Sequence, residues 1–414
     1  MAQVHNLQMQ GVTKPEISSR NETEGKKEGS SVNLTNNRDI LRGELSNKLL
    51  PILNLMKFSG EFYGDTSLSE TPPATSNFIS RIYCGMVLLG QITILAQAVA
   101  SLVYEGFDEM KNTYTLLLFG VWYLQSVGVN ITCLFALPIT RKRRSRFLRF
   151  ISFFLETADS GDFSGLSKWK LNAFLALTCF AALTNTTSIA LLTFFEDNSI
   201  ARFRPWNGRL TMRLLHVLIN FYNSFAWTLP IFLFGISCSL VSGMIDGFQK
   251  KVISQVHNFP DIGSLRKEHV KLCKTVSFAD KVFSPYLFVI LSLHIPLICF
   301  NFHQLLKSDN SRERDTIFFF TFLYWWMGLS SQIAVIFMFG IRVHEKIHGI
   351  YDALQQIVVA DCKEHLELLH FLMHLRGEPI GMSVGGLVVI NKSLLLSVVG
   401  IIISYLAVLL TLPA

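Results

Sequence analysis

The stretch Gly385–Ala414 reads GGLVVINKSLLLSVVGIIISYLAVLLTLPA, and it decides the fold class of the chain. From Ser393 to Leu412 it carries no charged residue for 20 positions. At about 1.5 Å per residue, a helix of this length measures about 30 Å, which is the thickness of the hydrocarbon core of a bilayer. The sequence ends two residues later, so we expect the C-terminal end of this span to lie at a membrane surface.

The composition of the whole chain is that of a polytopic membrane protein. Half of the 414 residues are hydrophobic and only 16% are charged, against roughly 25% in soluble domains. The formal net charge of +7 does not indicate nucleic-acid binding, because the basic residues lie mostly in loops between apolar runs. The seven Cys form no CxxC pair, which favours free thiols, most of them buried within apolar segments.

Six further apolar runs precede the last one, and each is near the ~20 residues that a span needs. The sequence therefore predicts an all-α membrane protein, with seven transmembrane helices in a domain of residues 77–414. Residues 1–76 are polar and predict a disordered cytoplasmic segment, with a short interfacial helix at Leu49–Met56. The predicted spans are 80–104, 113–138, 171–194, 215–242, 284–305, 316–340 and 388–412.

Lys and Arg are concentrated in one set of loops, which predicts the orientation. That set holds 19 basic residues and the other holds 8. Because cytoplasmic loops are enriched in Lys and Arg, we expect the N-terminus to be cytoplasmic and the C-terminus extracellular. Apolar residues recur at helical spacing in the long cytoplasmic loops, at Ile347, Ile350 and Leu354 and again at Leu366 and Leu369. This pattern predicts cytoplasmic helical extensions of spans four, five and six.

The last helix also carries the elements of a family motif. Ser404-Tyr405, five hydrophobic residues and Thr411-Leu412 align with the pattern Thr-Tyr, five hydrophobic residues, Gln-Phe. That pattern is the signature of insect gustatory receptors, and the run Gly385–Val399 is similar to the segment that precedes it. Together with the seven spans and the long inner loops, the chain resembles a divergent member of this family, within the insect odorant and gustatory chemoreceptor superfamily. The Gln-Phe pair is replaced here by Thr411-Leu412.

The resemblance implies a ligand-gated, non-selective cation channel of the plasma membrane that a small-molecule tastant opens. It also implies a homo- or heterotetramer in contact with membrane lipid, in which the last helices of four subunits line a central pore. Ser404 and Thr411 share one helix face, and a ring of Leu412 would form a hydrophobic gate. The alternative is that both hydroxyls bond a carbonyl one turn earlier and face a neighbouring helix. The pore and gate candidates are Ser404, Tyr405, Val408, Thr411 and Leu412.

Members of the family bind their ligands among the middle helices, so polar and aromatic residues of those spans are the pocket candidates. Asn220 and Asn223 can share a helix face, and an amide within a span is a functional candidate. Hydrogen bonding between helices is the alternative for such amides. The pair Trp325-Trp326 equally fits an interfacial aromatic belt. The candidate pocket residues are His216, Asn220, Asn223, His294, Phe322, Tyr324, Trp325 and Trp326.

The segment His344–His348 reads HEKIH and matches the H-E-x-x-H pattern of zinc proteases. No second ligand motif with an Asp is found in another span, and Arg342 and Lys346 disfavour a cation. We interpret the segment as the solvated face of an amphipathic helix. The same interpretation applies to His365, His370 and His374. We therefore expect no enzymatic activity, no cofactor and no metal site.

Two other classes of seven-helix or polytopic protein stay open as alternatives to a channel. A G-protein-coupled chemoreceptor would have its N-terminus outside, a D-R-Y-like triplet after span three and an N-P-x-x-Y motif in span seven. A small-molecule transporter would usually show an internal repeat or charges in mid-membrane. None of these features stands out in the sequence.

Overall fold

The computed structural model divides the chain into two units, Met1–Ile40 and Leu41–Ala414. In the first unit, the part described is helical from Glu28 onward. The second unit holds every other element and all of the sites discussed below. The structure describes residues 28–64, 76–105, 110–138, 145–158, 167–195, 209–255, 261–306, 316–357, 361–377 and 379–411.

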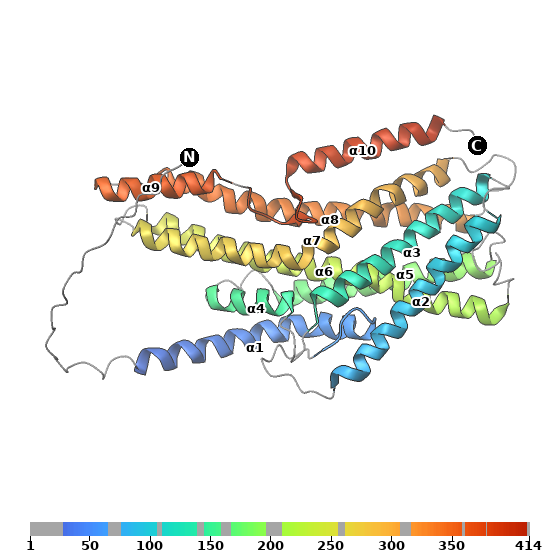
Figure 1. Ribbon diagram of the computed structural model, residues 1–414, viewed down its shortest axis with the longest axis horizontal. Helices are drawn as coiled ribbons and strands as arrows, with labels where there is room; N and C mark the ends of the chain where they lie inside the picture. Colours follow the sequence, from blue (N-terminus) through green and yellow to red (C-terminus); the bar gives the residue numbers. More distant parts are fainter. Residues whose placement is uncertain are drawn as a thin grey trace, which may run out of the picture. The chain divides into compact units, whose positions relative to one another are not determined.

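Seven of the described helices are long and apolar enough to cross a membrane, which confirms the predicted number of spans. Helices α6, α7 and α8 have 46, 45 and 39 residues, so they measure about 60–70 Å at 1.5 Å per residue. That is about twice the thickness of a bilayer core, and the predicted extension of these three spans as continuous helices is confirmed (Figure 1). The seven helices are α2 (Ser76–Glu105), α3 (Met110–Ala136), α5 (Lys168–Phe195), α6 (Leu210–Gln255), α7 (Ile262–Leu306), α8 (Thr316–Leu354) and α10 (Lys392–Thr411).

Helix α1 (Glu28–Phe58) corrects the expectation of a disordered segment for part of residues 1–76, of which 1–27 and 65–75 lie outside the described residues. Its apolar residues recur every three or four positions, and from residue 41 onward this stripe lies in the hydrophobic core of the second unit. The predicted short helix at Leu49–Met56 is therefore part of a longer one, and it packs within the protein rather than alone at a membrane surface. The polar composition of the segment masked this helical stripe. The buried residues are Leu41, Leu45, Leu49, Ile52, Leu53 and Met56.

A short helix, α4 (Arg146–Thr157), occupies part of the long loop between the second and third spans. Ser145 caps its N-terminus, since its hydroxyl accepts a hydrogen bond from the backbone N–H of Leu148 at 3.0 Å. Phe147, Phe150 and other apolar residues of one face are buried, and the helix packs against α7. The basic run 141–144 that precedes it lies outside the described residues.

Helix α9 (Cys362–Leu375) follows α8 and packs against α7 and α8. The residues that it buries are Leu368, Phe371 and Leu375. The predicted apolar face of Leu366 and Leu369 is instead exposed. Because leucines stand on more than one face of this helix, periodicity alone did not select the buried one.

A two-stranded antiparallel hairpin, β1 (Ser383–Val384) and β2 (Val388–Val389), connects α9 to α10. Gly385 and Gly386 have φ values of 63° and 74°, which L-residues with a side chain rarely adopt. The last span therefore starts at Lys392 and not at the predicted residue 388. Asn391 caps it, since its Oδ1 accepts the backbone N–H of Leu394 at 2.8 Å.

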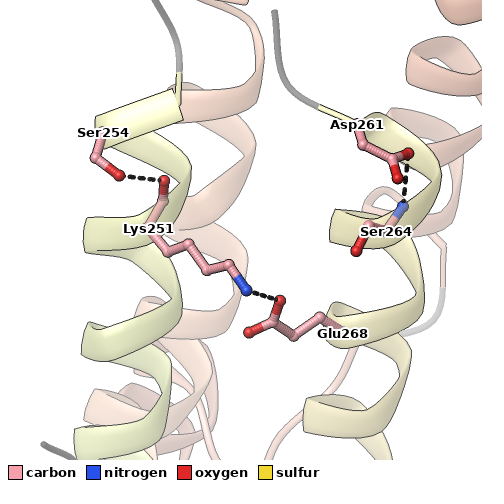
Figure 2. A network of polar contacts seen from close by, with 5 residues as sticks. All are labelled: Lys251, Ser254, Asp261, Ser264 and Glu268. Atoms are coloured by element: carbon pink, nitrogen blue, oxygen red, sulfur yellow. Dashed lines mark hydrogen bonds and ion pairs between the residues drawn. The ribbon is translucent and has the colours of Figure 1, made fainter. Parts of the chain in front are cut away.

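The far ends of α6 and α7 are joined by polar contacts (Figure 2). Lys251 of α6 forms an ion pair with Glu268 of α7. Asp261 precedes α7, and its Oδ1 accepts the backbone N–H of Ser264 at 3.1 Å, which caps the helix. The ion pair thus links the two helix extensions beyond the membrane-spanning part.

Candidate functional site

A cavity of about 430 Å³ lies between α3, α5, α6 and α8. This volume is within the range of small-molecule pockets in proteins, about 300–1,000 Å³. Its walls are mostly apolar and aromatic, with a few polar side chains among them. The lining includes Trp122, Phe174, Asn185, Ser224, Trp227, Tyr324, Trp325, Gly328, Gln332 and Phe339.

Three tryptophans from three helices form one wall of this cavity. The rings of Trp122 on α3 and Trp227 on α6 stack with centroids 4.1 Å apart and planes 23° apart. Trp325 on α8 meets Trp122 at 4.8 Å. Such contacts stabilise by about 0.5–1.5 kcal/mol beyond the area buried. The aromatic wall of the cavity is therefore built by the packing of α3, α6 and α8.

A chain of hydrogen bonds crosses the same region and links α5, α6 and α8. The indole N–H of Trp325 donates to Asn185 Oδ1 at 2.8 Å. Asn185 Nδ2 donates to Ser224 Oγ, also at 2.8 Å, and the Ser224 hydroxyl donates to the carbonyl of Asn220. The polar atoms of the wall thus satisfy one another, as buried polar groups must.

Gln332 is a lining residue whose amide nitrogen donates no hydrogen bond within the part of the chain that the structure describes. Its Oε1 lies 2.8 Å from His294 Nε2, and His294 Nδ1 lies 3.0 Å from Gln125 Oε1. A neutral imidazole has one donor and one acceptor nitrogen, and Gln125 Nε2 has no partner among the described residues. We therefore assign Gln125 with its amide nitrogen toward Nδ1, so that His294 Nε2–H donates to Gln332. The amide nitrogen of Gln332 is then available to a ligand.

Two of the predicted pocket residues, Tyr324 and Trp325, line the cavity. The hydroxyl of Tyr324 donates to the carbonyl of Ala181 on α5 at 2.9 Å. Phe322 lies outside the lining, and its ring packs against Trp325 with centroids 5.1 Å apart. His294 stands behind Gln332 and is joined to it by the hydrogen bond described above.

The other four predicted pocket residues lie elsewhere in the bundle, outside the lining. Asn220 donates its amide to the carbonyl of His216, and Asn223 donates to Asn220 Oδ1 at 3.5 Å. Trp326 packs against Phe302, with ring centroids 5.6 Å apart. Hydrogen bonding between helices is the alternative for these amides, but the two bonds described here both lie within α6.

Sequence reasoning missed Trp122, Trp227, Asn185 and Gln332. A signal was present for each, since Asn185 and Gln332 are amides within apolar spans and the two tryptophans lie in the middle of theirs. What the sequence did not indicate is that these four residues face the same space. Their helices are brought together only by packing.

The last span, α10, lies beside α7 at the outside of the helix bundle (Figure 1). Val398 is buried and Ile402 half-buried, and the carbonyl of Ile402 lies 3.9 Å from Cys299 Sγ of α7. At about 100° per residue, the direction opposite this packed face is occupied by small and polar residues. All of them are exposed: Ser393, Ser397, Gly400, Ser404 and Thr411.

The predicted pore residues within the described chain all lie on exposed parts of α10. Tyr405 and Val408 are each 59% exposed. Ser404 Oγ donates to the carbonyl of Gly400 at 2.9 Å and Thr411 Oγ1 to that of Val408 at 2.7 Å. The hydroxyls thus bond to their own helix, yet they face away from α7. Leu412, the predicted gate, lies outside the described residues.

The H-E-x-x-H segment is not the solvated face that its pattern suggested. His344 and His348 are half-buried, and both imidazoles contact the backbone of one residue. His344 Nδ1 lies 3.0 Å from the carbonyl of Ile380, and the Ile380 N–H donates to His348 Nε2 at 3.3 Å. Because the backbone engages one nitrogen of each ring, this pair serves to hold the segment after α9 against α8.

The model of the 7tm chemosensory receptor family matches residues 49–411. The chain belongs to this family. The resemblance to insect chemoreceptors drawn from the last helix is thereby confirmed, and the receptor is a multi-pass membrane protein. By sequence, no curated protein matches the receptor.

Solved structures of an insect olfactory receptor share the fold of this receptor. The structure of OR5 from Machilis hrabei matches with a TM-score of 0.68 at 12% identity, over 91% of this chain and 99% of that chain. The same protein in complex with eugenol matches with a TM-score of 0.64 at 12% identity, over 90% and 98% of the two chains. At this identity the likeness establishes the seven-helix architecture of the receptor.

Proposed function

We propose that the receptor is a ligand-gated, non-selective cation channel of the gustatory type, opened by a small-molecule tastant. The observation that carries this proposal is the exposed stripe of Ser397, Gly400, Ser404 and Thr411 on α10, opposite the face that packs on α7. Hydroxyl groups that face the hydrocarbon of the bilayer find no hydrogen-bond partner there. Facing other copies of α10 around a water-filled axis, they can hydrogen-bond to permeating water.

The chemistry of the stripe also supports weak ion selectivity. Between Ser393 and Thr411, α10 holds no carboxylate, so its face offers hydroxyls and no fixed charge to a cation. The position of Leu412, one residue beyond Thr411, suits a hydrophobic ring that closes the pathway by dewetting. We assign the pore to Ser404, Val408 and Thr411 and the gate to Leu412, whereas Tyr405, seven residues after the buried Val398, lies toward the α7 side of the helix.

The cavity supports the choice of a small, partly aromatic ligand. OR5 of Machilis hrabei has been solved with eugenol, and we infer that this receptor takes molecules of comparable chemistry among its middle helices. The tryptophan wall offers stacking, and Gln332 offers a donor. A sugar needs several polar groups around it, whereas the lining of this cavity is mostly apolar and aromatic, which favours bitter-type tastants.

The proposal includes the setting of the channel. Four copies, identical or from related receptors, surround one pore in the plasma membrane and contact its lipid. The N-terminus lies in the cytoplasm and the C-terminus outside, in keeping with the distribution of Lys and Arg. The receptor acts without enzymatic activity and without a cofactor.

The pore assignment is tested by cysteine substitution in oocytes that express the receptor alone and respond to an agonist. We expect a water-soluble thiol reagent to block the current of Ser404→Cys. The matched control is Ile402→Cys, whose side chain lies on the face that packs against α7, and it should keep its current. Equal block of both variants, or of neither, would contradict the assignment of this face to the pore.

The gate and the orientation have separate tests. Leu412→Ala should raise the current that flows without agonist, because a smaller ring no longer excludes water. An epitope tag after Ala414 should bind antibody on intact cells. A hidden tag would overturn the orientation, and a current that requires G-protein activity would favour the G-protein-coupled alternative. Agonist-driven uptake without current would favour the transporter.

A further inference from the structure

Three side chains that commonly bind metal ions meet on the extension of α7, away from the cavity. His269 and Cys273 stand one turn apart on α7, and His374 lies in the last turn of α9. One ligand atom from each lies within 4.8 Å of the other two. His269 is buried, Cys273 is half-buried and His374 is exposed, so the cluster is open to solvent on one side.

We propose that His269, Cys273 and His374 bind a divalent transition-metal ion, with Zn²⁺ the first choice, and that the ion joins α9 to α7. The inference concerns a site of its own and does not depend on channel activity. It departs from the expectation from the sequence that the protein has no metal site.

The separation of the two α7 side chains is that of two ligands in a zinc site. Cys273 Sγ lies 3.5 Å from His269 Nδ1 and 3.6 Å from Nε2. In a tetrahedral site with Zn–N of about 2.0–2.1 Å and Zn–S of about 2.3 Å, the distance between nitrogen and sulfur is about 3.6 Å. Because Sγ lies almost equally far from both ring nitrogens, the His269 ring has to turn one nitrogen toward the ion, and the exposed side chain of His374 has to approach.

The α7 ligands stand on a well-supported helix. The His269 ring packs between Phe248 of α6 and Phe371 of α9, with centroids 5.9 and 5.2 Å away. The preceding residue, Glu268, is tied to Lys251 of α6 by the ion pair shown in Figure 2. The helix that carries two of the three ligands is thus held in place before an ion arrives, which lowers the entropy cost of binding.

The ligand set selects the class of ion. Two imidazoles and one thiolate suit Zn²⁺ and its neighbours Co²⁺ and Cu²⁺, whereas Ca²⁺ and Mg²⁺ require oxygen ligands. On binding, the Cys273 thiol releases its proton to solvent and its sulfur bonds to the ion, and nothing is oxidised or reduced. Three protein ligands leave the fourth position of the ion to a water molecule.

A simple hydrogen bond between Cys273 and His269 is the competing explanation. It accounts for the 3.5 Å contact, but it gives no role to His374, whose ring centroid lies 6.0 Å from that of His269 at nearly a right angle. A metal site requires all three residues. The contribution of His374 therefore separates the two explanations.

The first test uses the purified full-length receptor in detergent, stripped of metal and titrated with Co²⁺. We expect one Co²⁺ per chain and an absorption band from thiolate-to-metal charge transfer. Cys273→Ser should abolish the band, and His374→Gln should weaken binding of Co²⁺ and Zn²⁺ at least about tenfold, the lower end of the effect of losing even an outer-sphere partner. Cys362→Ser and His370→Gln, two exposed positions of the same α9, are the matched controls and should bind as the unaltered receptor does.

The second test reads the contact between the helices. Zn²⁺ should protect Cys273 from alkylation and slow hydrogen exchange of the α9 amides, and both effects should be lost in His374→Gln. Because His374 is exposed, this variant should melt like the unaltered receptor without metal. A band that persists in Cys273→Ser, or equal metal affinity in His374→Gln and the unaltered receptor, would overturn the proposal. Zn²⁺ that leaves Cys273 as reactive as before would do the same.

Discussion

Ser383 of the hairpin before α10 donates both its backbone N–H and its hydroxyl to the carboxylate of Asp280 on α7. The N–H lies 2.6 Å from Oδ1, and the hydroxyl lies 2.8 and 2.9 Å from the two carboxylate oxygens. One turn along α7, the carbonyl of Ser284 accepts the N–H of Gly385 at 3.0 Å. The start of the last span is therefore fastened to α7 through these few polar contacts.

We predict that Ser383→Ala lowers the free energy of unfolding of the receptor by about 1.5–3 kcal/mol, the contribution of hydrogen bonds to a charged group. The backbone N–H remains to hold Asp280, so the fold should persist. The midpoint of thermal unfolding in detergent measures the loss. Ser277→Ala, an exposed serine on the same helix, is the control, and an equal loss there would show that the contact to Asp280 contributes nothing.

The size of the cavity can be changed at Gly328 on α8. This residue lines the cavity, and a Cβ placed on it meets no atom within 4 Å. Gly328→Leu should therefore fill part of the space and raise the agonist concentration for half-maximal current at least tenfold, with normal amounts at the cell surface. Gly349→Leu on the same helix is the matched control. A Cβ placed at Gly349 also meets no atom within 4 Å, and each of the two substitutions raises the helix propensity by about 1 kcal/mol. If both variants respond alike, the cavity is not the agonist site.

Trp325 and Trp326 are neighbours with different surroundings, and the structure predicts opposite costs for their replacement. Trp325→Phe leaves Asn185 Oδ1 without its donor, which should cost about 1–3 kcal/mol of stability. The indole nitrogen of Trp326 is buried without a partner among the described residues, so Trp326→Phe removes an unsatisfied donor and should cost less. Thermal unfolding of the two variants side by side measures the difference. A larger loss of stability in Trp326→Phe than in Trp325→Phe would contradict the role assigned to the hydrogen bond between Trp325 and Asn185.

Glu61, which follows α1, predicts a pH dependence of stability. Burial raises the pKa of its carboxyl from 4.5 to about 8. The unfolded chain therefore loses this proton at lower pH than the folded receptor does. Below about pH 4.5 Glu61 makes its whole contribution to the free energy of unfolding. As the pH rises, this free energy falls by up to about 1.4 kcal/mol per pH unit, and it stops falling above about pH 8.

The measurement is the midpoint of thermal unfolding between pH 5 and 9, for example in steps of about one unit. Glu61→Gln should flatten this part of the profile, because glutamine has no proton to lose. Glu156→Gln, at an exposed position of α4, should leave the slope as it is. An unchanged slope in Glu61→Gln would assign the pH dependence to other groups.

Several features of the receptor followed from local sequence. The charge-free run of Ser393–Leu412 predicted the last span, and similar runs predicted the other six. The helical spacing of Ile347, Ile350 and Leu354 predicted that α8 continues beyond the bilayer, where all three are buried. The family followed from Ser404-Tyr405 and the residues around them. Each of these depends on composition or spacing within one segment.

Other features depended on how the helices rotate and pack. About a hundred residues separate Trp122 from Trp227 and Trp227 from Trp325. Because their spans are apolar on nearly every face, the sequence pattern did not predict which residues would be in contact. The same holds for His374, which reaches His269 and Cys273 only because α9 folds back on α7. Partition of a helix into a bilayer sums over about 20 residues, so the sequence alone determined the spans and the family. The cavity, the exposed face of α10 and the metal-ligand cluster arise from contacts between distant segments, which only the tertiary structure decides.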